Sequence, residues 1–384
     1  MVSLAVIAVI SCTLFTGAAL ALPAQSYTAN GLTVTTSRVF EGHEMRLETF
    51  GDISAGEALS PVSTDGLLKY EITVDGENLH GFCTKNGTVV VPAIYESERL
   101  GAHFSNGRCK VAVYDPMTAT NKWGYIDEHG NMVIAAQFDD AEDFSEGLAA
   151  VEVNGKWGYI NTAGQMVIPA IYSLAQNFGE GWAYVHDADW NGYINTVGER
   201  MLQVKQVPVD TGMGVQMQNA YDGQYKFNDG YAVVIGLHSD YSGSLLLDKS
   251  GNLYPLGTDI TVTDVYSDGR VPVYKNGMYG AMDANGNLAV PYLYSYMTRF
   301  DNGVAVVQQN NRYGVIDVHG NIVVPIEWAF MSSFCNGVGT ARFAHDSSST
   351  DNKNGYYVLE VNGAGTSTAP ETPVQPSLTA IRTS

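Results

Sequence analysis

The segment closest to a metal-binding motif spans residues 187–192, Asp-Ala-Asp-Trp-Asn-Gly, and opens like a calcium loop. Such a loop supplies oxygen ligands at alternate positions and needs a bidentate Glu at position twelve. Position twelve here is Gly198, which offers no side-chain ligand. We therefore interpret the segment as an acidic hairpin loop, and the sequence predicts no metal site and no cofactor.

Motifs that would indicate catalysis are missing from the sequence. It has no Gly-x-Ser-x-Gly elbow, no His-Glu-x-x-His helix, no phosphate loop and no Cys-x-x-Cys pair. Residues 43–47, His-Glu-Met-Arg-Leu, begin like a zinc-protease motif but lack its second His. His129 and His319 fall in predicted turns, where a solvated surface position explains them. We expect no catalytic residues and interpret the protein as a non-enzyme.

Aromatic side chains are the other candidates for binding, because an exposed Trp or Tyr ring can stack on the apolar face of a sugar. Some aromatic residues recur at a fixed spacing, which favours packing between repeats over ligand binding: Trp123, Trp157, Tyr279 and Tyr313. Others do not recur and are the predicted ligand-binding residues: Trp190, Tyr241 and Trp328.

The elements that must position these residues form a tandem repeat. Lys-Trp-Gly-Tyr-Ile-Asp at 122–127 returns as Lys-Trp-Gly-Tyr-Ile-Asn at 156–161. The repeat glycines stand 34 residues apart (158 − 124, 192 − 158 and 314 − 280), and they are Gly124, Gly158, Gly192, Gly280 and Gly314. A fixed period of this length marks copies of one structural unit.

Each copy is predicted to be three antiparallel strands, as at residues 148–153, 156–161 and 166–172. Asn-Gly at 154–155 suits a two-residue hairpin turn, and Asn-Thr-Ala-Gly at 161–164 suits a turn capped by the Asn side chain. A Pro recurs in the third strand, as Pro169 does here. Because Pro cannot donate to a strand ladder, we expect the third strand near the outer edge of its sheet.

The strand at 148–153 and its copies carry apolar residues on both faces, with Ala149 and Val151 on one side and Leu148 and Ala150 on the other. Such a strand is buried on both sides, so the small sheets should stack face to face. Two arrangements allow this stacking, a closed β-propeller-like ring and an open superhelical stack of β repeats. We favour the ring with this strand innermost, because the last copy lacks a third strand and β-like runs at 26–60 could complete it.

The repeated Lys-Trp-Gly-Tyr-Ile motif, with Val-Ile-Pro-Ala-Ile-Tyr at 167–172 and Phe-Ser-Glu-Gly-Leu-Ala at 144–149, resembles the WG (KWG) repeat of bacterial secreted and cell-surface proteins. The resemblance covers roughly residues 67–361. It implies an all-β repeat fold and a binding or surface role, and it supplies no catalytic residues.

The two ends differ from the repeats. Residues 1–21 form an apolar run ending in Ala-Leu-Ala, which predicts a signal peptide cleaved before Leu22. A lipoprotein processed at Cys12, a retained membrane anchor and a start upstream of Met1 stay open. Residues 22–66 are a β segment that could complete the last repeat, 67–361 hold about seven repeats plus a partial last copy, and 362–384 are a disordered tail.

Charge and cysteine content narrow the partners. The chain has 40 acidic and 20 basic residues, a net charge of −20, which repels nucleic acids and anionic lipid surfaces. Three cysteines outside the signal peptide sit at unrelated repeat positions and are expected to be small buried hydrophobes: Cys83, Cys109 and Cys335. The sequence thus predicts a secreted or cell-surface scaffold that binds a cell-wall glycan or a protein and has no membrane span after signal cleavage. The alternative is a propeller-type extracellular enzyme acting on carbohydrate.

Overall fold

The computed structural model describes residues 25–40, 46–47, 67–74, 77–84, 88–117, 119–210, 215–223, 226–237, 243–342 and 356–362. These residues form β-strands and turns with one short 3-10 helix, Ser97–Arg99. Within these ranges, no helix is long and apolar enough to cross a membrane. The predicted signal peptide, Cys12, Tyr241 and the tail after Asn362 lie outside the described residues.

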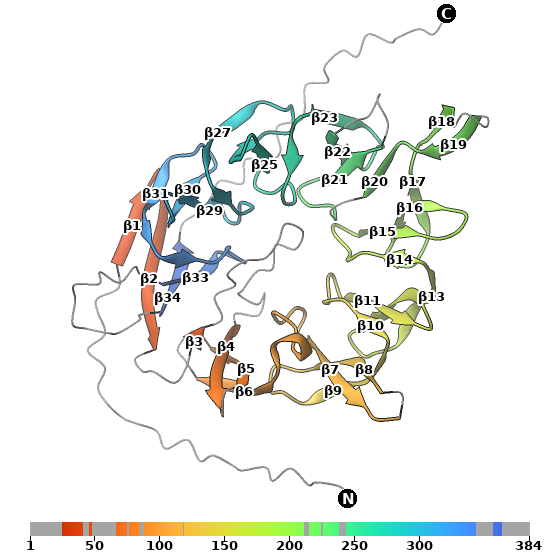
Figure 1. Cartoon of the computed structure of the whole chain (residues 1–384), viewed down its shortest axis with the longest axis horizontal. Helices are drawn as coiled ribbons and strands as arrows, with labels where there is room; N and C mark the ends of the chain where they lie inside the picture. Colours follow the sequence, from red (N-terminus) through yellow and green to blue (C-terminus); the bar gives the residue numbers. More distant parts are fainter. Residues whose placement is uncertain are drawn as a thin grey trace, which may run out of the picture.

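Eight of the nine sheets are small and antiparallel and follow one another around a ring (Figure 1). We call them blades 1 to 8. Blade 1 contains β3 (Arg46–Leu47), β4 (Leu67–Val74), β5 (Glu77–Thr84) and β6 (Val89–Tyr95), and blade 2 contains β7 (Cys109–Asp115), β8 (Thr120–Ile126) and β9 (Met132–Phe138). Blade 3 contains β10 (Asp140–Ala141), β11 (Leu148–Val153), β12 (Lys156–Asn161) and β13 (Met166–Tyr172). Blade 4 contains β14 (Leu174–Ala175), β15 (Trp182–His186), β16 (Asn191–Asn195) and β17 (Arg200–Gln203).

Blades 5 to 8 complete the ring. Blade 5 contains β20 (Tyr221–Gly223), β21 (Tyr231–Gly236), β22 (Gly243–Asp248) and β23 (Leu253–Gly257), and blade 6 contains β24 (Thr261–Val262), β25 (Val271–Lys275), β26 (Met278–Met282) and β27 (Leu288–Tyr294). Blade 7 contains β28 (Tyr296–Met297), β29 (Val304–Gln309), β30 (Arg312–Asp317) and β31 (Ile322–Trp328). Blade 8 contains β32 (Phe330–Met331), β33 (Val338–Arg342), β34 (Tyr356–Asn362), β2 (Leu32–Phe40) and β1 (Gln25–Ala29). The ninth sheet is a hairpin, β18 (Gln206–Asp210) and β19 (Val215–Asn219), which projects outward beside blade 4 (Figure 1).

The predicted strands of the repeat have the bounds of β11, β12 and β13 in blade 3. The expectation that the strand at 148–153 is innermost is wrong, because a two-residue strand, β10, lies on the inner side of β11, and most other blades have an equivalent. Two residues are too few to carry a hydrophobic period, so no pattern in the sequence marks this strand. Figure 1 shows β10 and β11 toward the centre of the ring and β13 on its outside.

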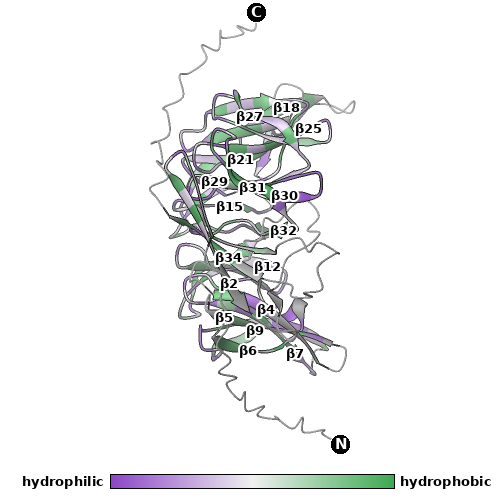
Figure 2. Ribbon diagram, turned by 90° about the vertical axis from the view of Figure 1, so that its left-hand side faces the viewer, coloured by the Kyte–Doolittle hydropathy of each residue, from purple (hydrophilic) through white to green (hydrophobic). Residues whose placement is uncertain are grey.

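Strand β11 and its counterparts in the other blades are buried on both faces, as predicted. In β11, Leu148 and Ala150 pack toward blade 4, while Ala149 and Val151 pack toward blade 2. Eight separate apolar clusters fill the eight junctions between neighbouring blades. Figure 2, an edge-on view, shows apolar segments within the stacked strands. A ring held by eight equivalent junctions has no exposed blade face, which confirms the propeller-like arrangement over the open stack.

The repeat glycine is required by the outer strand. Pairing between β12 and β13 shifts register between Trp157 and Tyr159, across Gly158, and again between Tyr159 and Ile160, so the β13 backbone crosses directly over Gly158. A Cβ at Gly158 would lie 2.6 Å from the Ala170 nitrogen and 2.6 Å from the Ile168 oxygen. Gly124 and Gly280 face the same obstruction, since a Cβ there would lie 2.5 and 2.6 Å, respectively, from a carbonyl oxygen of the outer strand. The repeat therefore keeps Gly because no larger residue fits beneath the bulged strand.

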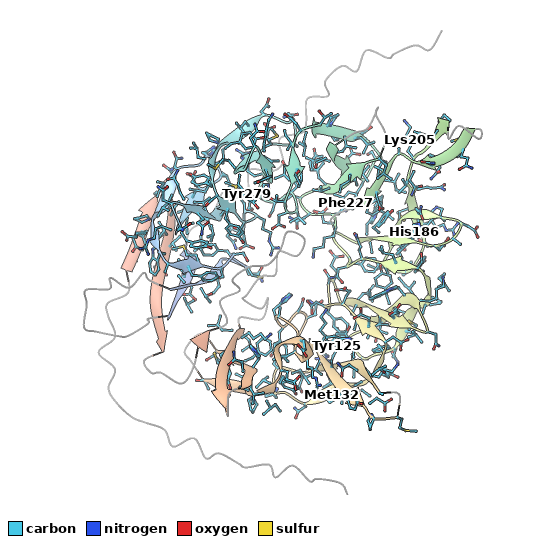
Figure 3. All side chains as sticks on the ribbon, in the orientation of Figure 1. Tyr125, Met132, His186, Lys205, Phe227 and Tyr279 are labelled. Carbon is cyan, nitrogen blue, oxygen red and sulfur yellow. The ribbon has the colours of Figure 1, made fainter. Side chains whose placement is uncertain are left out.

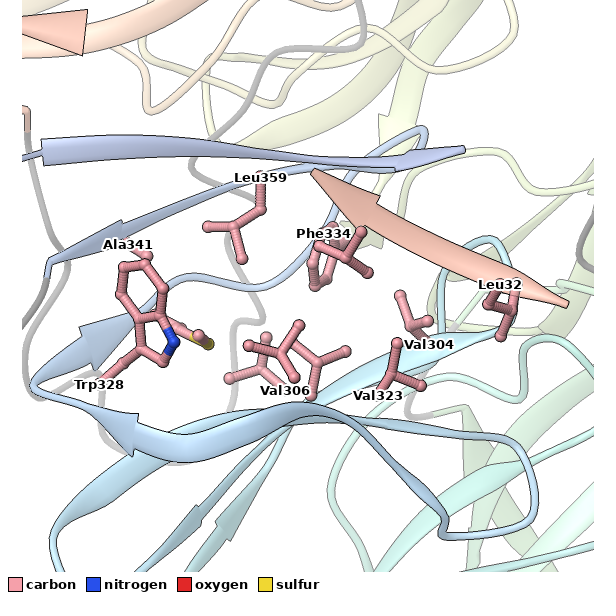
Figure 4. Packing of buried hydrophobic residues seen from close by; sticks show 12 residues of the cluster. Leu32, Val304, Val306, Val323, Trp328, Phe334, Ala341 and Leu359 are labelled. Atoms are coloured by element: carbon pink, nitrogen blue, oxygen red, sulfur yellow. The ribbon is translucent and has the colours of Figure 1, made fainter. Parts of the chain in front are cut away.

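The N-terminal strand completes blade 8. β2 pairs antiparallel with β34, the last strand of the described residues, with Val34 opposite Val361. Leu32 and Val34 enter the apolar cluster between blades 7 and 8 (Figure 4). On the other side of blade 8, Val358 packs against Leu68 of blade 1. The first and last parts of the sequence thus share one sheet, and this sheet packs against both of its neighbours.

Candidate functional site

A row of five aromatic side chains crosses blades 6, 7 and 8. We call it the aromatic row, and its members in order are Tyr274, Tyr279, Tyr296, Tyr313 and Phe330. Successive ring centroids are separated by 4.9, 6.1, 6.2 and 5.5 Å. These separations fall in the range of interacting aromatic pairs, so the five rings form one continuous surface feature. Tyr279 is labelled in Figure 3.

Strand pairing fixes the positions of these rings. Tyr279 and Tyr313 occupy the repeat's Trp position, the second residue of the strand that follows the hairpin turn in blades 6 and 7. Tyr274 lies directly opposite Tyr279 across its hairpin, and Gln308 lies between Tyr296 and Tyr313 in the register of blade 7. Directly opposed residues of antiparallel strands project from the same face of a sheet. The hairpins therefore bring these aromatic side chains to one end of the ring of blades.

The row has an exposed side and a packed side. Tyr274 is 37% exposed and Tyr296 is 40% exposed, which leaves much of each ring accessible to a ligand. Tyr279 and Tyr313 are partly buried and pack on the clusters between blades 6 and 7 and between blades 7 and 8. Aromatic rings anchored in this way bind a ligand without first losing much conformational freedom.

The row is a local feature and not a consequence of the repeat. The innermost strand begins with Asp140, Leu174 and Thr261 in blades 3, 4 and 6, where blades 7 and 8 have Tyr296 and Phe330. The residue opposite the Trp position is Glu152 in blade 3 and Gln308 in blade 7, where blade 6 has Tyr274. Packing between blades therefore does not require these three additional rings.

Polar groups flank the row. The Ser295 hydroxyl donates to the Gln308 Oε1 at 2.8 Å, and Lys275 pairs with Asp259 at 2.7 Å. The hydrogen bond from Lys275 lowers the pKa of Asp259, so this pair is charged at neutral pH. Desolvation, with the charge of Asp264, raises the pKa of Tyr296 to about 12. Its phenol therefore stays protonated and can donate a hydrogen bond to a ligand hydroxyl.

Two of the predicted ligand-binding residues are not exposed. Trp328 is 1% exposed in the cluster between blades 7 and 8 (Figure 4), and Trp190 is 7% exposed between blades 3 and 4. Trp328 occupies the last position of the outer strand, opposite Tyr313, as Tyr172 lies opposite Trp157, so it is a repeat residue after all. The expectation that these two rings are exposed is therefore wrong.

Trp190 is buried for a different reason. In blade 4 the repeat's Trp position holds Asn191, a smaller residue, and Trp190 fills the adjacent space between the blades. The Arg200 guanidinium lies 4.8 Å from the centre of its ring and covers it. Tyr241, the third predicted residue, lies outside the described residues.

In the calcium-like segment at 187–192, backbone nitrogens of the same segment donate hydrogen bonds to the Asp187 carboxylate. The Asp187 Oδ1 accepts hydrogen bonds from the Asp189 and Trp190 backbone nitrogens at 2.7 and 2.8 Å. Its other oxygen lies 3.7 Å from the Arg200 guanidinium. In the part of the chain that the structure describes, no group of three or more His, Cys, Asp or Glu side chains is placed to hold a metal ion.

The cysteines Cys83, Cys109 and Cys335 are buried free thiols. Cys83 and Cys335 pack in the cluster between blades 8 and 1, and Cys109 packs in the cluster between blades 1 and 2. Burial raises the pKa of the Cys83 thiol to about 12. A thiol that stays protonated is a poor nucleophile and a poor metal ligand, so Cys83 acts as a small apolar group.

The closed ring of small antiparallel sheets defines a β-propeller-like repeat protein. The family model described as "WG containing repeat" matches residues 123–157, 157–185, 279–313 and 313–345. These four matches include the Trp or Tyr and Gly of blades 2, 3, 6 and 7 described above. The chain therefore contains four copies that match the WG repeat.

Comparison with curated protein sequences yields no match. Among solved structures, the chain is similar to a eukaryotic initiation factor, with 10% identity over 88% of this chain and 92% of that chain and a TM-score of 0.47. It is also similar to an oligogalacturonate lyase from Vibrio parahaemolyticus (10% identity, 88% and 96% covered, TM-score 0.34) and to prolyl oligopeptidase B from Galerina marginata (7%, 82% and 55%, TM-score 0.43). Similarity at this level carries no inference about function.

Proposed function

We propose that this protein is an exported, non-catalytic scaffold that binds carbohydrate chains through the aromatic row. The continuous row of five rings across blades 6, 7 and 8 is the observation that supports this proposal. The apolar face of a sugar ring packs on an aromatic ring, and several rings in line suit a chain better than a single sugar. A cell-wall glycan outside the cytoplasm is a ligand of this kind.

The charge of the protein is compatible with such a ligand. A net charge of −20 disfavours nucleic acids and anionic membranes, whereas a neutral glycan is not repelled. Flanking side chains such as Gln308 and Ser295 supply donors and acceptors for sugar hydroxyls at the edge of the row. Stacking would provide affinity, and these groups would orient the chain.

The test is a titration of the full chain with soluble oligosaccharides of β-1,4-linked N-acetylglucosamine and of β-1,4-linked glucose, measured by calorimetry. Replacing Tyr296 by Ala removes the central ring and should weaken binding about tenfold, since one stacked ring contributes roughly 1–3 kcal/mol in comparable stacking sites. Tyr114→Ala is the matched control, because Tyr114 is 51% exposed but lies on β7, away from the row. Equal affinity of all three proteins, or no saturable binding, would count against the proposal.

Two further measurements test the remaining parts of the proposal. Release of reducing ends from these oligosaccharides by the purified full chain would favour the alternative of a carbohydrate-acting enzyme. N-terminal sequencing of the exported protein should give Leu22 as its first residue. Recovery of the intact N-terminus in the exported fraction would instead support a retained anchor.

A further inference from the structure

The aromatic row lies at one end of the ring of blades, which we call the hairpin end. Tyr274 stands beside the hairpin turn of blade 6, and Tyr296 lies opposite Gln308, next to the hairpin turn of blade 7. In blade 8, Phe330 lies opposite Arg342, the last residue of β33. All of these positions are at the same end of their blades, so a ligand on the row approaches the ring from this end.

The last described strand leaves blade 8 at the opposite end. β34 begins at Tyr356, opposite Arg342, and ends at Asn362. Close to its end, the Val361 backbone nitrogen donates to the Gly337 carbonyl oxygen at 2.8 Å, and Gly337 lies in the turn between β32 and β33. The chain therefore emerges from the ring at the end remote from the aromatic row.

The sequence that follows β34 carries prolines at a fixed spacing. They are Pro370, Pro373 and Pro376, and they lie outside the described residues. A polyproline II helix has three residues per turn and rises about 3.1 Å per residue, so prolines at this spacing share one face and stand about 9 Å apart. Proline-rich segments of this kind bind surfaces lined with aromatic rings. The chain thus contains both a proline-rich segment, residues 370–376, and a row of aromatic rings.

The spacing of the row suits this segment. Neighbouring ring centroids are between 4.9 and 6.2 Å apart, so prolines about 9 Å apart can contact alternate rings. Alternate members of the row are Tyr274, Tyr296 and Phe330, which gives three rings for three prolines. A polyproline II backbone makes no internal hydrogen bonds, so its carbonyl oxygens are free to accept from the phenol of Tyr296 and the amide of Gln308.

Charge is also complementary between the segment and the row. Glu371 is the only charged residue between positions 363 and 381. Arg312 is exposed immediately before Tyr313, at the hairpin end of blade 7. An ion pair between Glu371 and Arg312 would fix the direction of the segment along the row, because charge pairs at a surface orient a partner more than they strengthen its binding.

Distances favour binding between two copies of the chain over binding within one. From Asn362 to the level of Phe330 the path runs about 20 Å along β34 and about 10 Å across two strand spacings. It cannot run straight through blade 8, since both faces of this blade pack against its neighbours. Eight residue steps (370 − 362) span at most about 29 Å when fully extended. Pro370 therefore reaches its own row only in a stretched chain, and it reaches the row of another copy without strain.

We propose that residues 370–376 of one copy bind the aromatic row of a second copy, so that the chains associate head to tail. Each copy offers a segment at one end of the ring and a row at the other, and contacts of this heterologous type can continue from copy to copy. The proposal uses the same rings as the carbohydrate site but does not depend on a carbohydrate ligand. A bound segment and a bound glycan would exclude each other.

The experiment measures the mass of the full chain by sedimentation velocity over a range of concentrations. Wild type should associate as concentration rises. Tyr296→Ala should stay monomeric because the row is damaged, and so should a variant with Pro370→Ala, Pro373→Ala and Pro376→Ala, which we call the proline variant. Tyr114→Ala is the matched control and should associate like wild type, since Tyr114 is 51% exposed on β7, away from the row.

Mixing the two defective proteins gives the decisive measurement. Tyr296→Ala retains an intact segment and the proline variant retains an intact row, so the mixture should form a one-to-one complex and nothing larger. Arg312→Gln, at an exposed position, should weaken the association of the full chain without affecting its fold. A monomeric wild type at every concentration would overturn the proposal, and so would a monomeric mixture, because association would then use another surface.

A synthetic peptide of residues 366–379 tests the spacing of the prolines. Calorimetry should show saturable binding of this peptide to the proline variant, and adding Tyr296→Ala to that variant should weaken binding about tenfold through loss of one ring. A control peptide of the same composition with irregularly spaced prolines should bind much more weakly, and equal binding of both peptides would contradict the match to alternate rings. No sugar is present in these experiments, so their outcome is independent of the oligosaccharide titrations.

Discussion

The N-terminal strand β2 completes the sheet of blade 8, and the Val34→Ala variant tests how far this strand protects the rest of that blade. Val34 is fully buried on β2, in the cluster between blades 7 and 8. The substitution removes two methyl groups from a packed site. At about 0.8 kcal/mol for each buried carbon, with a further cost for the cavity, the expected loss is about 2 kcal/mol.

This loss should appear at the far end of the chain. Val34 pairs with Val361, so weaker docking of β2 exposes the backbone of β34 (Tyr356–Asn362) to solvent. Hydrogen exchange followed by mass spectrometry should show β34 amides exchanging about 30-fold faster, since each 1.4 kcal/mol is roughly a factor of ten when opening is local. Amides of β12, on another side of the ring, should change little. Val167→Ala is the control, because Val167 is 43% exposed on β13.

One result would refute this reasoning. If the exchange of β34 is the same in wild type and in Val34→Ala, while the variant is destabilised elsewhere, β2 does not protect the last strand. An open stack gives that result, because each of its repeats contacts only its neighbours in sequence. A uniform increase over all blades would instead mean that the whole ring opens as one unit, which requires a closed ring to which β2 is coupled.

Two other expectations concern the repeat itself. Gly158→Ala should destabilise the protein by about 1–3 kcal/mol in chemical denaturation, because the new Cβ meets the backbone of β13. Gly155 lies in open space at φ +74°, so Gly155→Ala should cost about 1 kcal/mol through backbone strain alone. Desolvation raises the pKa of Asp268 in the folded state. The folded state therefore binds a proton at this carboxyl more tightly than the unfolded state does. The contribution of Asp268 to stability improves as pH falls from neutral toward the unfolded-state pKa near 4. Asp268→Asn should therefore raise the unfolding free energy at pH 7, and the gain should shrink as pH falls, as measured by urea denaturation at several pH values.

The strands were predictable because several independent features of the sequence indicate the same bounds. Alternating apolar residues, the Asn-Gly turn at 154–155 and the capped turn at 161–164 all indicate the same bounds, and the structure has β11, β12 and β13 at those bounds. The two-residue inner strands carry too little pattern to be found. Their positions follow only from tertiary pairing, as between Ala141 and Val151.

The candidate site was harder to predict, since a residue's exposure is set by the neighbouring blade. Trp328 looks unique in the sequence because other copies have a different aromatic residue, such as Tyr172, at the last position of the outer strand. The burial of Trp328 follows from this shared position. A usable signal for the aromatic row did exist. Tyr296 and Phe330 are 34 residues apart (330 − 296), and the copies at Asp140 and Leu174 are not aromatic. A repeat position that turns aromatic in adjacent copies indicates a surface specialisation.

The aromatic row and the closure of the ring meet at blade 8, and this leads to a final prediction. Phe330, the last ring of the row, begins β32, and the next residue, Met331, packs in the same cluster as Val34. Loss of β2 docking should therefore loosen Phe330 and leave Tyr274, two blades away, in place.

A double-mutant cycle on oligosaccharide affinity measures this coupling. Val34→Ala should weaken binding less than Phe330→Ala does, and the combined variant should bind no more weakly than Phe330→Ala alone, because both changes act on the same ring. The same cycle with Tyr274→Ala should be additive, since Tyr274 packs in blade 6 beside Tyr279 and not in the closing sheet. Additivity in both cycles would mean that closure and binding are separate properties. Non-additivity at Phe330 alone would mean that the N-terminal strand both completes the ring and fixes one end of the binding surface.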